Sequence, residues 1–134
     1  MNTIKYTYYL HCMFEEEEIN KISQILQNEN INSLHIDLFY NLPLQYIKNI
    51  ETLMRNLSYN IENLIIMHLP LIITENIKYD VLCLDNLPIS LNKIYTNNYS
   101  SLILKVPFGC DVIDINENND SFTEYRSKIK LFLI

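Results

Sequence analysis

A repeated seven-residue stretch constrains the fold of this chain more than any other feature. Residues 30–36 (Asn-Ile-Asn-Ser-Leu-His-Ile) return as residues 60–66 (Asn-Ile-Glu-Asn-Leu-Ile-Ile), 30 positions later. The apolar helical pattern in front of each copy also returns, at a spacing of 28, with Ile22, Ile25 and Leu26 corresponding to Ile50, Leu53 and Met54. The repeating unit is therefore a helix, a polar turn and a buried strand. Such a unit predicts a stacked array of repeats, a solenoid, rather than a closed globular fold.

Composition and charge narrow the class of protein. The chain has 134 residues, enough for one domain, and 49% of them are hydrophobic, so a packed core is expected. A net charge of -6, with Arg55 and Arg126 as the two arginines, argues against nucleic-acid binding. The longest apolar run, residues 64–73, is interrupted by His68 and Pro70 and is too short to cross a bilayer. The N-terminus lacks the features of a signal peptide. We expect a soluble, cytoplasmic protein that binds neither nucleic acid nor membrane.

Thiol and imidazole groups are the candidates for metal or catalytic chemistry. The three cysteines, Cys12, Cys83 and Cys110, are widely spaced and lack a Cys-x-x-Cys pair, which favours reduced, buried thiols. His11, Cys12 and His35 could bind zinc if the first strand pairs with the second, although their spacing is not diagnostic. A Cys-His hydrolase could combine Cys12 or Cys83 with His35 or His68, but no glycine-rich oxyanion turn accompanies them. We expect no metal, no cofactor and no enzymatic activity.

The first half of the chain alternates between strand and helix patterns. Aromatic and β-branched residues over 3–13 predict a strand. Four glutamates at 15–18 precede apolar positions at helical spacing, as acids do in the first turn of a helix, where they complement its dipole. The second helix is predicted over 43–57, with Asn41 as its N-cap and Pro43 in its first turn.

The later units are shorter, at 18 and 20 residues. Strands are predicted over residues 31–37, 61–67, 81–84 and 101–105. Because right-handed crossovers make successive strands parallel, we expect all four to be neighbours in one sheet. The strand residues expected in the core are Leu34, Ile36, Leu64, Ile66, Leu82 and Leu84. Gly109 predicts a positive-φ turn before a last strand at 112–115. The single domain then consists of an N-terminal cap (1–18), irregular repeats (19–115) and a C-terminal cap (116–134), whose residues 121–134 fit a helix or a strand.

This α/β pattern of a parallel sheet with helical or irregular crossovers resembles a leucine-rich-repeat array. Residues 84–94 (Leu-Asp-Asn-Leu-Pro-Ile-Ser-Leu-Asn-Lys-Ile) look like the Leu-Pro-x-Ser-Leu-x-x-Leu pattern of FNIP-type leucine-rich repeats. Residues 104–110 are similar to the closing segment of such proteins. The chain departs from the pattern where Leu38 or His68 replaces the asparagine that usually follows the strand. The resemblance implies a non-enzymatic scaffold that binds protein. Because these repeats are abundant in large DNA viruses of amoebae, it also implies a place in the host cytoplasm or the virion.

A candidate binding surface follows from the expected sheet. Neighbouring residues of a strand point to opposite faces, so the residue inside each Leu-x-Leu pair would join one row on the open face. That row consists of His35, Ile65, Cys83 and Ile103. Apolar side chains at exposed positions are typical of interaction surfaces, unless the N-terminal segment or a second copy covers the sheet. We therefore expect a protein–protein interaction scaffold. The alternative is a structural or assembly component that self-associates through a sheet edge or its apolar C-terminus.

Overall fold

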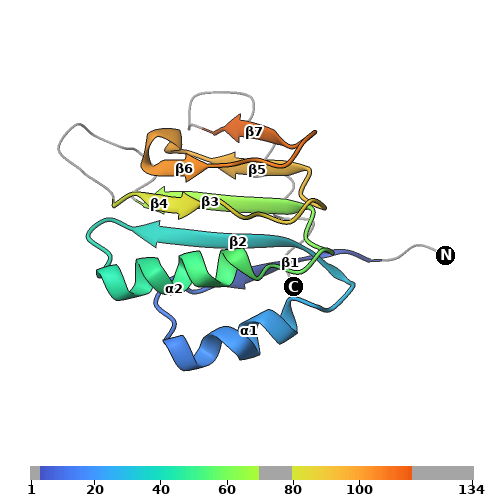
Figure 1. Ribbon diagram of the computed structural model, residues 1–134, viewed down its shortest axis with the longest axis horizontal. Helices are drawn as coiled ribbons and strands as arrows, with labels where there is room; N and C mark the ends of the chain where they lie inside the picture. The colour runs from blue at the N-terminus through green and yellow to red at the C-terminus, as the bar shows by residue number, and fades with distance from the viewer. Residues whose placement is uncertain (1–3, 70–79, 116–134) are drawn as a thin grey trace.

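The protein is an α/β protein built on a parallel β-sheet. The computed structural model describes residues 4–69 and 80–115. Within these ranges, five strands form one sheet in the order β1-β2-β3-β5-β7, and every neighbouring pair is parallel. The strands are β1 (Tyr6–Leu10), β2 (Ile31–Phe39), β3 (Asn63–Leu69), β5 (Lys93–Thr96) and β7 (Asp111–Asp114). Chain order and spatial order therefore agree across the sheet (Figure 1).

The segments between these strands form a second layer on one face of the sheet. The first two crossovers carry the helices α1 (Ile19–Ile25), preceded by the short 3-10 turn η1 (Glu16–Glu18), and α2 (Leu44–Arg55). The later crossovers carry the strands β4 (Leu82–Leu84) and β6 (Leu102–Leu104), which pair with each other in a parallel two-stranded sheet, and the 3-10 turn η2 (Tyr99–Ser101). Figure 1 shows both helices and this small sheet in front of the five-stranded sheet.

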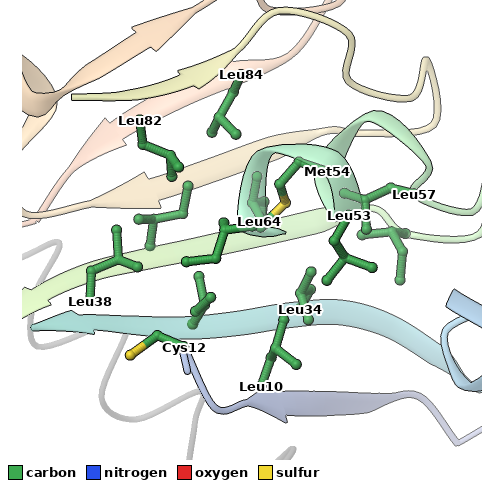
Figure 2. Close-up of a cluster of buried hydrophobic side chains, with 14 of the residues drawn as sticks. Leu10, Cys12, Leu34, Leu38, Leu53, Met54, Leu57, Leu64, Leu82 and Leu84 are labelled. Atoms are coloured by element: carbon green, nitrogen blue, oxygen red, sulfur yellow. The ribbon is translucent and has the colours of Figure 1, made fainter. Parts of the chain in front are cut away.

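The hydrophobic core lies between the two layers. All six strand residues expected in the core are at most 1% exposed: Leu34, Ile36, Leu64, Ile66, Leu82 and Leu84. Figure 2 shows Leu34 and Leu64 from the large sheet, Leu53 and Met54 from α2, and Leu82 from β4 in one cluster. The predicted buried face of the strands is therefore confirmed.

The prediction of a single sheet was correct for two of its four strands. Residues 31–37 and 61–67 lie in the parallel neighbours β2 and β3. Residues 81–84 and 101–105 also contain strands, but these lie in the second layer, and β5 continues the large sheet instead. The physical reason is that a strand of either layer buries alternate residues in the same core, so the alternation does not identify the layer. The 30-residue period identifies the strands of the large sheet, because it continues from Leu34 and Leu64 to Ile94 on β5.

The expected helix and turn signals were mostly found. The acidic first turn is confirmed, since η1 leads directly into α1 and the Glu15 backbone N–H donates to Glu18 Oε1 at 3.2 Å. Gly109 has the predicted positive φ, 83°. Asn41 is not an N-cap: its φ is 64°, and Pro43 occupies the cap position of α2. The predicted C-terminal cap, 116–134, lies outside the described residues.

Candidate protein-interaction surface

The four residues predicted to form one binding row divide between the two layers. His35 and Ile65 are cross-strand neighbours on β2 and β3, as expected. Cys83 and Ile103 are neighbours of each other on β4 and β6, in the second sheet. The predicted single row was therefore wrong, because residues 82–84 were assigned to the large sheet. A role in partner binding stays a prediction for each of the four.

The row that the large sheet does form on its outer face follows the strand register. It consists of Tyr9, His35, Ile65, Tyr95 and Ile113. The rings of Tyr9 and His35 are stacked with centroids 4.4 Å apart, and His35 Nε2 lies 2.7 Å from Asp37 Oδ1. Burial, and secondly the negative charge of Asp37, raise the pKa of the Tyr9 phenol. Tyr95 and Ile113 were missed because β5 was missed, although the 30-residue period would have located Tyr95.

The centre of this outer face is buried within the chain. Ile65 is 6% exposed, and Met67 and Ile115, which pack with it, are 2% and 0% exposed. His35 is 4% exposed. Of the two alternatives, an open row and a covered sheet, His35 and Ile65 therefore fit the covered sheet, whereas Ile103, on the second sheet, is 58% exposed. The outer face of the sheet offers little free apolar surface at its centre.

The described thiols and imidazoles are poorly placed for chemistry. Cys12 packs into the core, whereas His35 lies on the opposite face of the sheet, so the structure does not bring the proposed zinc ligands together. Among residues 4–69 and 80–115, no group of three or more His, Cys, Asp or Glu could hold a metal ion. Burial raises the pKa of the Cys12 thiol and lowers that of His68 to about 4, even though Asn97 opposes the second shift. Both groups are therefore neutral near pH 7.

Four turns at equivalent positions carry a different set of exposed side chains. Each turn precedes a strand of the large sheet and is closed by a backbone hydrogen bond from its fourth residue to its first. The turns span 28–31, 58–61, 88–91 and 107–110, with N···O distances of 2.9, 3.2, 3.1 and 3.1 Å. Their second residues are Glu29, Tyr59, Ile89 and Phe108, and the last three are 75%, 82% and 107% exposed. We call Tyr59, Ile89 and Phe108 the turn row. The repeat contains a signal for two of its members, because Tyr59 and Ile89 are 30 residues apart. Phe108 follows Ile89 by 19 residues and lies outside this period.

Hydrogen bonds from the third residue of two turns hold neighbouring turns together. Asn60 Nδ2 donates to the backbone carbonyl oxygens of Leu26, Asn28 and Ile31, at 3.0, 2.9 and 2.7 Å. One turn later, Ser90 Oγ donates to the carbonyl oxygen of Ile61 at 2.8 Å. These bonds fix the stacking of the first three turns. Tyr59 and Ile89 are therefore held at adjacent levels of the stack.

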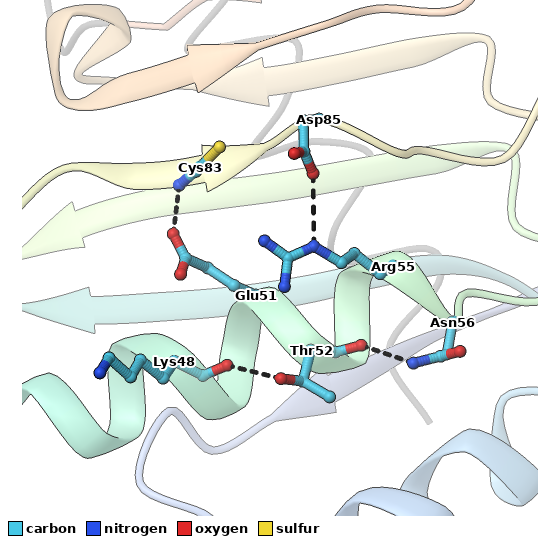
Figure 3. A network of polar contacts seen from close by, with 7 residues as sticks. All are labelled: Lys48, Glu51, Thr52, Arg55, Asn56, Cys83 and Asp85. Atoms are coloured by element: carbon cyan, nitrogen blue, oxygen red, sulfur yellow. Dashed lines mark hydrogen bonds and ion pairs between the residues drawn. The ribbon is translucent and has the colours of Figure 1, made fainter.

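A groove lies beside the second and third turns. It has a volume of about 320 Å³ and is lined by Arg55, Asn56, Leu57, Tyr59, Asn86, Leu87, Pro88 and Ile89. Leu57, Leu87 and Pro88 are buried, whereas Arg55 is exposed. Arg55 Nε lies 3.4 Å from Asp85 Oδ1, as Figure 3 shows. We call this depression the turn groove; most of its accessible lining is polar, and Arg55, Asn56 and Asn86 supply the polar side chains.

Comparison with known proteins adds no family to this description. No protein-family model, no curated protein and no solved structure matches the chain. The resemblance to FNIP-type leucine-rich repeats therefore stays a prediction. In the part of the chain that the structure describes, no helix is long and apolar enough to span a bilayer.

Proposed function

We propose that this chain is a non-enzymatic protein-interaction scaffold, built as a short solenoid of leucine-rich-repeat type. The solenoid is supported by the 30-residue period, by the alternation of the chain between two layers and by the agreement of chain order with strand order. The turns before β2, β3, β5 and β7 repeat the same hydrogen bond, as the equivalent positions of stacked repeats would.

The turn row is the observation that carries the binding function. Tyr59, Ile89 and Phe108 are 75%, 82% and 107% exposed at equivalent turn positions. Single exposed apolar residues are common on soluble proteins and need no explanation. Three in the turns before the neighbouring strands β3, β5 and β7 would gather apolar surface on one side of the stack, and gathered apolar surface is typical of an interaction site. Tyrosine and phenylalanine are also enriched at the centres of protein interfaces.

Self-association through a sheet edge is the alternative that we rank second. The strands β1 and β7 lie at the two edges of the described sheet. However, β7 begins and ends with the exposed residues Asp111 and Asp114. Charged side chains on an edge strand oppose the pairing of that edge with another strand. The charges on β7 therefore disfavour extension of the sheet at that edge.

Site-specific photo-crosslinking tests the proposal. A photoreactive phenylalanine analogue at position 108 should crosslink a partner protein, and the additional change Ile89→Asp should abolish the product. The matched control is the same analogue at Tyr99, which is 55% exposed and follows β5, whereas the turn row precedes the strands. Equal products from positions 108 and 99, or products insensitive to Ile89→Asp, would contradict the proposal. Crosslinks between copies of the chain would favour the assembly alternative. The melting temperature of each variant must equal that of wild type, so that a lost crosslink is not caused by unfolding.

A further inference from the structure

We infer that the outer face of the large sheet is a docking surface for the chain's own C-terminal residues, 116–134. The inference goes beyond the proposed function, because it concerns the face of the sheet and not the turn row. It follows from the burial of the outer face, from the layer in which the described crossovers lie and from the position of Ile115.

The outer face is buried at positions spread across the sheet. Ile65 and Met67 on β3 are 6% and 2% exposed, and Ile115, which packs with them, is 0% exposed. Thr7 and Ser33, cross-strand neighbours on β1 and β2, are 7% and 6% exposed. Each of these two stands two residues before a member of the outer row and therefore lies on the same face. The burial thus extends from the β7 side of the sheet to β1.

Neighbours on the same face do not suffice for this burial. Side chains stand roughly perpendicular to a sheet, so their outward ends stay open unless a second layer packs over them, about 10 Å away. Ile103 shows the uncovered case: it lies on the small sheet opposite Cys83 and is 58% exposed. The exposures are those of a single chain, so the layer over Ile65 and Met67 belongs to the same chain.

The described crossovers do not provide this layer. The helices α1 and α2 and the strands β4 and β6 lie on the opposite face, where they enclose the core with Leu34 and Leu64 (Figure 1). The cover of the outer face therefore comes from outside residues 4–69 and 80–115.

Two of the three remaining segments are poorly connected for this role. Residues 1–3 reach about 10 Å, less than the two strand spacings and the length of β3 that separate the start of β1 from Met67. Residues 70–79 leave the C-terminal end of β3 and must return to β4 in the other layer. Thr7 and Ser33 lie instead near the N-terminal ends of their strands.

Residues 116–134 have the required connection and length. They continue directly from Ile115, which is already on the outer face. Crossing the sheet from β7 to β1 spans four strand spacings, or about 19 Å. Even coiled as a helix, this segment would reach about 28 Å. It is therefore long enough to cover the face from one edge to the other.

The sequence of the segment complements the face. Its large apolar residues recur at helical spacing: Phe122, Tyr125, Ile129, Phe132 and Leu133. Residues 125–134 also carry Arg126, Lys128 and Lys130 and no acid, in a chain of net charge -6. On the outer face, Asp37 offers the opposite charge with a side chain that is 41% exposed. Burial of the apolar residues supplies the favourable term, and a partner protein of this face would have to displace the segment.

Methionine oxidation by hydrogen peroxide, followed by mass spectrometry of the full chain, tests the inference. Met67 is 2% exposed on the outer face, Met54 is 1% exposed in the core and Met13 is 45% exposed. Peroxide converts an accessible methionine to its sulfoxide. The double change Ile129→Asp and Phe132→Asp should oxidise Met67 about tenfold faster or more, because carboxylates are unfavourable against an apolar face. Met54 should stay protected, since the core between the layers is not touched.

Two further variants serve as controls. Asn118→Asp with Asn119→Asp adds the same two charges at polar positions of the segment and should leave Met67 protected. Leu71→Asp with Ile72→Asp disturbs residues 70–79 and should also leave Met67 protected.

A crosslink provides a second measurement that needs no disruptive change. A photoreactive phenylalanine analogue in place of Phe132 should crosslink to a peptide of β2 or β3 within the same chain. The same analogue at Tyr99, which is 55% exposed in η2, should not.

Each other outcome overturns the inference. Wild-type Met67 that oxidises as fast as Met13 would mean that the outer face is open. Met67 that stays protected in the Ile129→Asp and Phe132→Asp variant, or that only the changes at 71 and 72 expose, would assign the cover to another segment. If Met54 oxidises as well, the variant has unfolded and the crosslink decides: no product within one chain, or a product between two chains, contradicts the inference. None of these results affects the turn row, so the proposed function stands or fails separately.

Discussion

Two isoleucines show at the residue scale how location decides the effect of a charge. Ile65 is 6% exposed on the outer face of the large sheet, and Ile103 is 58% exposed on the second sheet. We predict that Ile65→Asp destabilises the protein by several kcal/mol, because a carboxylate would be buried without a partner. Ile103→Asp, the matched control, should change stability by at most about 0.5 kcal/mol. Urea denaturation measures both. Equal stability of the two variants would mean that the outer face opens in solution.

His68 predicts a pH dependence of stability. Its side chain is 0% exposed, and burial lowers its pKa from 6.5 to about 4. As the pH falls, His68 is therefore protonated near pH 6.5 in the unfolded chain but only near pH 4 in the folded chain. The contribution of neutral His68 is fully present above pH 6.5 and is lost as the pH falls towards 4, by about 3 kcal/mol in total at about 1.4 kcal/mol per unit.

Denaturation between pH 7 and 5 checks this prediction, because that window lies above the titration of ordinary carboxyl groups. The control is His68→Gln, which keeps a polar side chain without a titratable ring. Its stability should be nearly constant over the same window. A wild-type protein that is as stable at pH 5 as at pH 7 would show that the His68 pKa is not lowered.

At the element scale, the junction between helical and extended crossovers depends on one carboxylate. Glu51 on α2 accepts a hydrogen bond at 2.6 Å from the backbone N–H of Cys83 on β4 (Figure 3). The side chain of a helix thus takes the place of a neighbouring strand at the edge of the small sheet. Loss of the acceptor would leave a half-buried N–H unpaired, which typically costs about 1–3 kcal/mol.

We therefore predict that Glu51→Ala destabilises the protein by about 1–2 kcal/mol. Glu51→Gln should lose less than half of that, because its side-chain carbonyl oxygen can still accept the bond. Hydrogen exchange at the Cys83 amide measures the local effect and should accelerate in Glu51→Ala before exchange in β2 or β3 does. An unchanged exchange rate at Cys83 would show that the bond does not stabilise β4.

The sequence was sufficient to predict where the helices and most strands lie along the chain. It was not sufficient to predict which of the two layers the strands at 82–84 and 102–104 join. Apolar periodicity located both helices and most strands because it reports which side of an element is buried. It placed Leu82 and Leu84 in the core but could not distinguish two layers that bury residues in the same core. The adjacency of His35 and Ile65 was predictable from the repeat. The burial of Ile65 was not, because covering an outer face depends on segments distant in sequence. The turn row was encoded at the repeat spacing, in Tyr59 and Ile89.

At the scale of the whole molecule, the β7 edge of the described sheet opposes self-association. The exposed residues Asp111 and Asp114 bound the edge strand β7. We predict that the double change Asp111→Thr and Asp114→Thr promotes association, because threonine favours strand pairing and the repulsion between edges is lost. Sedimentation velocity should show larger species at high concentration for this variant and not for wild type. A control that replaces the acids Glu16 and Glu17 before α1 should stay unchanged.

The change from helical to extended crossovers also sets the curvature of the molecule. The helices α1 and α2 contact each other, and packed helices stand about 8–10 Å apart, whereas the strands beneath them are separated by about 4.8 Å. The second layer is therefore wider than the sheet in the first half, and the sheet must bend towards its outer face. Beyond β3, β4 and β6 pair at the same spacing as the strands of the large sheet, so nothing forces a bend. Tyr59, Ile89 and Phe108 precede β3, β5 and β7, so a partner that crosses these turns lies over the half of the molecule with extended crossovers.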